Sequence, residues 1–299
     1  SPDLETHRQH VRQVLQRLHD HGLVINPSKC VFAADSLEFL SHVVSADGIQ
    51  PTPNRVTAIN EFSRPTSLRQ LRRFLGMVNY YRRFIPQAAQ LVRPLTDMLA
   101  GKPKYSSAFP WTDATESAFA AAKSAIASAV MLTHPIPSAP LNLMCDASDT
   151  CVGAVLQQFV NEEWQPLAFF SKKLTAPECR YATFGRELLA VYLAIRHFQH
   201  YLEGRPFHVL TDHRSLTHAI RSPSSKHSPR EARQLGYISE FTTDVRYVSG
   251  PSNPVADALS RVHAVTAPPT VDFSALASAQ AVDAELLQLR GQPDCSLQF

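Results

Sequence analysis

Apolar positions in the first part of the chain change from helical to extended spacing. Over Leu4–His21 they recur every three or four residues, which predicts an amphipathic helix, and Gly22 follows at a position where helices commonly end. Leu23–Ile25 and Leu37–Ser45 are short and rich in β-branched and aromatic residues, which predicts extended structure. Asp47-Gly48, which comes next, predicts a turn.

Past Pro65 the spacing is helical again, with Thr66 as the expected N-cap. The apolar residues that share one face of this predicted helix are Leu68, Leu71, Leu75 and Val78. A second helix is predicted over Asp113–Val130, opened by a capping-box pattern of Asp113 with Glu116. Its expected inward residues are Phe119, Ala122, Ile126 and Ala129.

A proline cluster then interrupts the helical pattern, and we place a domain boundary there. Its members are Pro135, Pro137 and Pro140. The strands predicted beyond it are Leu141–Cys145, Cys151–Gln158, Pro166–Lys172, Phe207–Thr211 and Asp244–Val248. The helices predicted there are Tyr181–Tyr201, Arg230–Phe241 and Val255–Val262. Three adjacent strands followed by alternating elements indicate an α/β layer fold.

Composition narrows the class of protein. The chain has 299 residues, of which 44% are apolar and 18% charged, as in globular proteins of about two domains. No apolar run is long enough to cross a membrane, and the first residues lack the pattern of a signal peptide. Without an initiator Met, the chain is expected to be a fragment or a processed product. The five cysteines include no Cys-x-x-Cys pair, so we expect free thiols in a reducing compartment.

The net charge of +3 is too small to indicate a nucleic-acid partner, but its distribution is uneven. A basic stripe, with no acid between Glu61 and Asp97, consists of Arg69, Arg72, Arg73, Arg82 and Arg83. Aromatic residues are interleaved with it, namely Tyr80, Tyr81 and Phe84. This combination suits a phosphate backbone with rings packed on sugars or bases, and a solvated basic face over an ordinary core is the alternative.

Four acids lie at predicted strand ends or on helices in apolar surroundings: Asp146, Glu187, Asp212 and Asp257. Burying several carboxylates is costly unless cations compensate their charge. Oxygen ligands without a His and Cys set favour magnesium or manganese over zinc. From spacing alone, helix caps and surface acids remain the simpler interpretation.

Five ordered blocks of sequence make the interpretation specific. They are Cys145–Ser148 with Gly153–Gln158, Phe169–Leu174, Arg186–Ala190, Thr211–His213 and Asn253–Arg261. Together they resemble the RNase H domain of gypsy-type LTR retrotransposon reverse transcriptases. Upstream blocks resemble the palm end and the thumb of the same polyproteins, namely Phe39–Val44, Gly48-Ile49 and Phe74–Ile85. Asp272–Leu289 resembles the spacer before integrase.

The resemblance implies an α/β fold: an RNase H-like mixed five-stranded sheet with flanking helices, preceded by a mostly helical thumb-like domain. It divides the chain into residues 1–62 as a palm remnant and 63–135 as a helical thumb or connection. Residues 139–263 would form the RNase H-like domain, and 264–299 a linker and spacer towards a missing integrase.

The resemblance also implies a mechanism. Asp146, Glu187, Asp212 and Asp257 would hold two Mg²⁺ ions, or Mn²⁺, for hydrolysis of the RNA strand of an RNA/DNA hybrid. His213 beside Asp212 would contact the scissile phosphate or transfer a proton, with a surface histidine as the alternative. Arg214, Lys226 and Arg230 would touch the hybrid's backbone. No histidine lies between Val245 and Asp257, where Tyr247 and Asn253 stand instead.

One departure limits the assignment. The Tyr-x-Asp-Asp turn of the family's polymerase centre is absent, since the chain contains no adjacent Asp pair. A non-catalytic nucleic-acid-binding fragment, or activity only as part of a full RNA-directed DNA polymerase, are the alternatives. The expected partners are the hybrid and the remainder of the polyprotein, with no membrane. The expected location is intracellular, in the cytoplasm within a virus-like particle, or nuclear.

Overall fold

The computed structural model describes residues 3–100, 109, 111–221 and 227–249. The chain divides into two compact units, Ser1–Leu37 and Glu38–Phe299. Each unit is described by itself. Within the described residues, no helix has both the length and the apolar character needed to cross a membrane.

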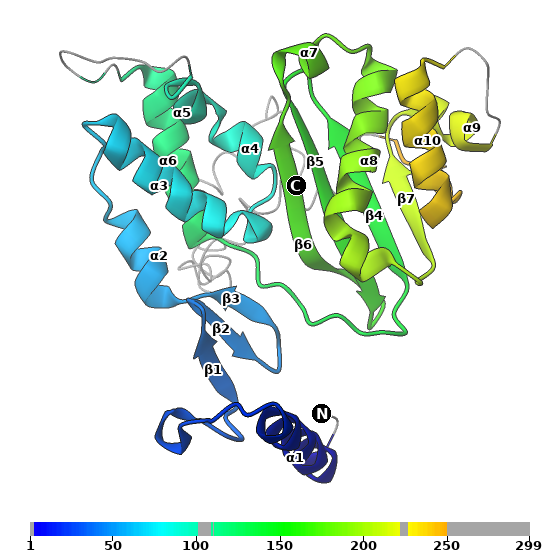
Figure 1. The fold of residues 1–299 in the computed structure, drawn as a ribbon. Helices are drawn as coiled ribbons and strands as arrows, with labels where there is room; N and C mark the ends of the chain where they lie inside the picture. The colour runs from blue at the N-terminus through cyan, green and yellow to red at the C-terminus, as the bar shows by residue number, and fades with distance from the viewer. Residues whose placement is uncertain (1–2, 101–108, 110, 222–226, 250–299) are drawn as a thin grey trace, which may run out of the picture. The chain divides into compact units, whose positions relative to one another are not determined.

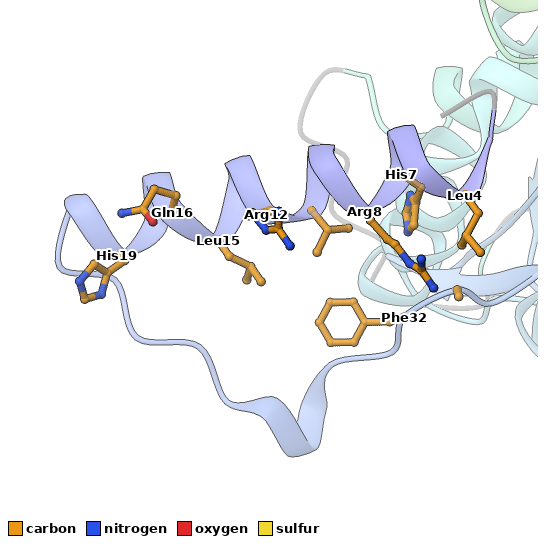
Figure 2. A pocket seen from close by; sticks show the side chains of 10 residues that line it. Leu4, His7, Arg8, Arg12, Leu15, Gln16, His19 and Phe32 are labelled. Carbon is orange, nitrogen blue, oxygen red and sulfur yellow. The ribbon is translucent and has the colours of Figure 1, made fainter.

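The first unit contains the predicted amphipathic helix, α1 (Leu4–Asp20), and a short 3₁₀ turn, η1 (Pro27–Lys29). Asp3 caps α1 by accepting a hydrogen bond from the Thr6 backbone N–H at 2.8 Å. No residue of α1 is buried. Its apolar side chains face Phe32 across an open pocket of about 660 Å³ whose lining includes no carboxylate (Figure 2). The unit therefore presents apolar surface but no acidic site.

A small sheet follows, in the order β1-β2-β3: β1 (Ser36–Phe39), β2 (His42–Ser45) and β3 (Ile49–Pro51). The predicted extended segment is interrupted because Leu40 and Ser41 adopt positive φ angles. The predicted turn at Asp47-Gly48 is confirmed. Gly48 is required there, since a Cβ at this position would lie 2.3 Å from the Leu132 carbonyl oxygen.

A helical layer comes next, and two of its caps differ from the predicted ones. Its elements are α2 (Pro53–Asn60), α3 (Leu68–Tyr80), η2 (Arg82–Phe84), α4 (Ala88–Leu91), α5 (Arg93–Asp97) and α6 (Asp113–Ala127). Ser67, not Thr66, caps α3 through the Gln70 N–H, while the Thr66 N–H donates to the Gln70 side chain. Thr112 caps α6 in a capping box with Thr115, so the predicted box of Asp113 with Glu116 is wrong by one residue.

The second half of the chain forms the predicted mixed five-stranded sheet, in the order β6-β5-β4-β7-β8. Its strands are β4 (Leu141–Ala147), β5 (Cys151–Val160), β6 (Glu163–Lys173), β7 (Phe207–Thr211) and β8 (Val245–Tyr247). Strands β4, β5 and β6 are antiparallel neighbours, whereas β4–β7 and β7–β8 are parallel pairs. The helices of this half are α7 (Ala176–Cys179), α8 (Thr183–Leu202), α9 (Arg214–Arg221) and α10 (Pro229–Phe241). Of these, α7 and α9 were not predicted.

The sheet is covered on both faces. Helices α8 and α10 lie across one face (Figure 1). On β4, Leu143 and Cys145 pack into the core under α8, whereas Met144 between them belongs to a second core with the helical layer. Phe169 of β6 joins that second core. The helical layer and the sheet therefore share buried side chains, although the proline cluster separates them in sequence.

The shared core predicts cooperative unfolding of the two layers. Phe169→Ala should lower the free energy of unfolding by about 3–5 kcal/mol, because Phe169 is 6% exposed between the layers. The two tryptophans report on each layer separately, Trp111 on the helical layer and Trp164 on β6. In single-tryptophan variants, denaturant unfolding followed by fluorescence should shift equally for both reporters.

Phe159→Ala is the matched control, because Phe159 is 39% exposed. It should cost no more than about 1 kcal/mol. If Phe169→Ala shifted the Trp164 transition and left that of Trp111 in place, the two layers would not form one cooperative unit.

Candidate functional site

Two of the predicted acids lie at the same edge of the sheet. Asp146 is near the end of β4, and Asp212 directly follows β7. The two strands run parallel, with Met144 paired to Leu210. Each acid lies two residues beyond its member of this pair, so Asp146 and Asp212 lie side by side along the strand direction. The carboxyl ends of neighbouring parallel strands meet at one edge, which brings these side chains together.

Glu187 reaches the same place from helix α8. Its side chain is 3% exposed, and Leu188 and Val191 on the same helix pack into the core beneath. Each of the three acids offers a carboxylate oxygen, and these oxygens lie within 4.8 Å of one another. Asp146 is half-buried and Asp212 is exposed, so the acidic cluster opens to solvent on the side of Asp212.

Burial and mutual repulsion oppose ionisation of this acidic cluster. Burial, followed by the charges of Asp212 and Asp146, raises the pKa of Glu187 from 4.5 to about 8. Burial and then the charge of Asp212 raise the pKa of Asp146 above its ordinary value. The backbone N–H of Ala147 acts in the opposite direction on both pKa values.

The chemistry of the acidic cluster fits a hard divalent cation. Glu187 Oε2 is buried and has no hydrogen-bond partner among the described residues, so an acceptor points into the cluster unsatisfied. An ion bound there would compensate the repulsion that raises the two pKa values. Burial keeps the pKa of the neighbouring Cys145 well above its ordinary value, so the donors are carboxylate oxygens and not a thiolate.

Asp257, the fourth predicted acid, and Lys226, a predicted backbone contact, lie outside the described residues. Their predicted roles remain predictions. So does the predicted helix Val255–Val262.

His213 is partly buried beside the acidic cluster. Its backbone N–H donates to Thr211 Oγ1 at 3.1 Å, and its ring stands edge-on to Phe184 with centroids 6.0 Å apart. Ring atom Nδ1 is buried without a hydrogen-bond partner among the residues that the structure describes. A histidine next to Asp212 with an uncommitted ring nitrogen suits proton transfer or a phosphate contact.

Two arginines predicted to contact the nucleic-acid backbone, Arg214 and Arg230, pack on aromatic rings near the sheet. The guanidinium of Arg214 lies 4.8 Å from the centroid of Tyr247, and that of Arg230 lies 3.5 Å from the centroid of Tyr181. Tyr247 is 42% exposed, so it is a platform for Arg214 and not a core residue. Both arginines are thereby fixed in direction.

The basic stripe is only partly on the surface. Arg69, Arg72 and Arg73 are exposed on α3, with Arg73 above the Phe62 ring at 5.9 Å. Tyr80 is 50% exposed and donates to the Leu40 carbonyl. Tyr81 is 3% exposed and packs in the core, with its hydroxyl donating to the Ser41 carbonyl. Arg82 and Arg83 are partly buried.

Three features of the site were missed in the sequence. The Ala147 amide between Asp146 and Glu187 is a backbone group, which no residue pattern reveals. Arg186 forms an ion pair with Asp149 at 2.6 Å and so links α8 to the turn after β4. The contact of Phe184 with His213 also depends on tertiary packing. Of the three features, only Arg186 had a signal in the sequence, because it directly precedes Glu187 in one of the family blocks.

Comparisons with known proteins agree with this geometry. Residues 111–209 match the family model described as an RNase H-like domain found in reverse transcriptase. The Tf2-3 and Tf2-4 transposon polyproteins of Schizosaccharomyces pombe are 35% identical over 265 residues, which is 88% of this chain and 20% of each relative. The chain thus spans about a fifth of the length of these curated relatives.

Solved structures show the same fold. The foamy viral protease-reverse transcriptase in complex with RNA/DNA hybrid matches with a TM-score of 0.67 at 19% identity, covering 91% of this chain and 36% of that one. The foamy viral protease-reverse transcriptase designated dRH, in complex with double-stranded DNA, matches with a TM-score of 0.67 at 18% identity, covering 83% of this chain and 44% of that one.

The mixed five-stranded sheet with acids at its carboxyl edge defines the class as RNase H-like. More narrowly, the chain contains an RNase H-like domain of the kind found in reverse transcriptase and is similar to one part of the Tf2 transposon polyproteins.

The raised pKa of Glu187 predicts an unusual pH dependence of stability. The folded chain keeps the Glu187 proton up to about pH 8, whereas the unfolded chain releases it near the ordinary pKa of 4.5. Because the folded state binds more protons in this window, the free energy of unfolding should fall as pH rises through it. Urea unfolding in a chelating buffer measures this slope.

Glu187→Gln should flatten the slope, because the amide carries no proton to lose. Glu163→Gln removes an exposed carboxylate at the far end of β6 and should keep the slope of the unmodified chain. Equal slopes for the two variants would show that Glu187 ionises normally in the folded protein.

Proposed function

We propose that this chain hydrolyses the RNA strand of RNA/DNA hybrids with the help of divalent cations. The observation that carries the proposal is the convergence of the Asp146, Glu187 and Asp212 carboxylates, with one buried oxygen left unsatisfied. A buried cluster of like charges costs several kcal/mol in a protein without a counter-charge. A role in cation binding explains why the three acids lie together.

Each acid has a distinct part in the proposed reaction. Buried Glu187 and half-buried Asp146 hold the cations from the protein side, while exposed Asp212 faces the substrate. Asp257 is proposed as the fourth ligand on the basis of sequence resemblance. These residues would hold two Mg²⁺ or Mn²⁺ ions, whose chemistry would be to activate a water and to stabilise the leaving 3′ oxygen. His213 takes or delivers a proton next to Asp212.

The helical layer supplies nucleic-acid binding in this proposal. Exposed Arg69, Arg72 and Arg73 on α3 carry charge for a phosphate backbone, and half-exposed Tyr80 adds a ring. The foamy viral protease-reverse transcriptase, which has a similar fold, was solved in complex with an RNA/DNA hybrid, and this supports a hybrid as the substrate. Selection of the hybrid would rest on groove shape and 2′-hydroxyl contacts. The rest of the polyprotein is the proposed second partner.

A cleavage assay tests the catalytic proposal. With magnesium, the purified chain should cut the labelled RNA strand of a hybrid and leave 5′-phosphate ends. Asp212→Asn should lower the rate by at least about a hundredfold, because it removes one anionic ligand while keeping the side-chain shape. Gel analysis of the labelled strand measures both rates.

Glu163→Gln is the control for loss of one negative charge and should cut at the unmodified rate. Binding of hybrid without cutting would indicate a non-catalytic binding fragment. Cutting restored only by added upstream polyprotein would indicate that the complete polymerase is required.

A salt titration tests the helical layer. Replacing Arg69 and Arg72 together with Ala should weaken hybrid binding and reduce the slope of log K against log salt by about 2, one unit for each lost phosphate contact. Arg233→Ala, an exposed arginine on α10, should leave the slope unchanged. An unchanged slope in the α3 variant would assign those arginines to a solvated face.

A further inference from the structure

The Asp146 carboxylate is poorly supported by its own domain. The backbone N–H of Ala147 acts on it, but no side chain among the described residues donates a hydrogen bond to it. Carboxylates that ligate metals are themselves usually held in direction by hydrogen bonds from an outer layer of residues. Such a donor to Asp146 would have to come from the elements packed against the sheet.

The register of the sheet shows which way the Asp146 side chain points. Asp146 pairs with Gly153 of β5, and Met144 pairs with Val155. Paired residues of antiparallel strands project to the same face. Met144 and Val155 both pack into the core shared with the helical layer, so Asp146, two residues further, projects towards that layer as well.

Gln87 lies on the helical-layer side, directly over this pair. A Cβ on Gly153 would stand 3.9 Å from Gln87 Cγ, which is ordinary van der Waals contact, so the Gln87 side chain packs over Gly153. Helix α4 is fastened above β6 because the Ala89 N–H donates to the buried Ser171 Oγ at 2.9 Å. This bond fixes the height of Gln87 above the sheet to which β4 and Asp146 belong.

A hollow of about 10 Å³ separates the two layers at this point, and Asp146 and Gln87 both line it. Its other polar side chains are those of Gln90, Ser148 and Ser171. A hollow of this size with several polar partners has room for about one water molecule. A second small hollow is also lined by Gln87 and Asp146, but its walls are mostly apolar.

The donors around the hollow are not equivalent. The Ser148 hydroxyl already bonds with Cys151, and the Ser171 hydroxyl accepts from Ala89. Among the described residues, the amide of Gln87 has no hydrogen-bond partner. Gln87 also has a φ of 47°, which side-chain-bearing residues rarely adopt. Strained backbone of this kind recurs where a side chain has a functional role.

We propose that Gln87 is a positioning residue of the nuclease site: its amide is linked to the Asp146 carboxylate through one water in the hollow and fixes the direction of that carboxylate for cation binding. This inference rests on the proposed function, which supplies the cation site. It goes beyond that function because it gives the helical layer a part in the site. The consequence is that the thumb-like layer and the RNase H-like sheet complete one centre together.

Direct cation binding tests the inference without relying on catalysis. Calorimetric titration of the full chain with Mn²⁺ should show about tenfold weaker binding for Gln87→Gly than for the unmodified chain. Gln87→Asn keeps an amide and tolerates the positive φ, so it should recover most of the affinity. In the cleavage assay, Gln87→Gly should lower kcat while the KM for hybrid stays unchanged.

Asn161→Gly is the matched control. Asn161 also has a positive φ of 51°, but it stands in the turn between β5 and β6, away from the hollow. It should relieve the same kind of backbone strain and leave Mn²⁺ binding unchanged. Neither glycine variant should lower the melting temperature. Measuring it therefore separates a loss of Mn²⁺ affinity from a failure to fold.

The outcomes distinguish this inference from the proposed function. Weaker Mn²⁺ binding by Gln87→Gly in a chain that never cuts hybrid would support the positioning role and overturn the nuclease proposal. Unchanged Mn²⁺ binding by Gln87→Gly in a chain that cuts hybrid would overturn the positioning role alone. Equal loss of affinity in Gln87→Asn and Gln87→Gly would also overturn it, since the amide would then be irrelevant.

Discussion

Repulsion among carboxylates in a partly buried space is the constraint on which the rest of this structure depends. Asp146, Glu187 and Asp212 come from a strand, a helix and a strand end, and their oxygens lie within 4.8 Å of one another. Burial, together with the charges of Asp212 and Asp146, raises the pKa of Glu187 to about 8 and so opposes its ionisation. The charge of Arg186 offsets this repulsion only in part, so the acidic cluster suits a bound cation.

The fold meets this constraint by covering both faces of the sheet. Helix α8 brings Glu187 to the carboxyl edge from one side, and the core beneath it fixes the position of the helix. The helical layer covers the other face through Met144, Val155 and Phe169. Because strand residues alternate between the two faces, β4 serves both cores and carries Asp146 between them. Movement of either layer would therefore change the acidic cluster.

In the proposed function, arginines on α3 and acids on the sheet would divide the chemistry of nucleic-acid processing between the layers. The exposed part of the basic stripe offers sequence-independent attraction for phosphates, which falls as salt rises. The acidic cluster would repel the same phosphates unless cations bind first. In the proposed enzyme, bound cations would cancel the repulsion between the acidic cluster and the phosphates, so that the substrate could approach this edge of the sheet.

Most of the fold followed from local pattern. Alternating or continuous apolar runs gave the five strands, and helical spacing gave α1, α3, α6, α8 and α10. The exact caps were missed because Ser67 and Thr112 compete with equally suitable neighbours, and α9 was missed because eight residues are too few to establish a periodic pattern. The predicted convergence of the acids came from resemblance, since spacing allowed surface positions equally well.

The sequence by itself determined the type of each major element and the chemistry of the candidate ligands, because both depend on residues close together in the chain. Only the tertiary structure decided that Met144 and Phe169 face the helical layer, that Tyr81 is buried, and that Gln87 stands over Gly153. These facts depend on which layer covers which face of a sheet. That choice is made by contacts between residues far apart in sequence, which a local pattern does not encode.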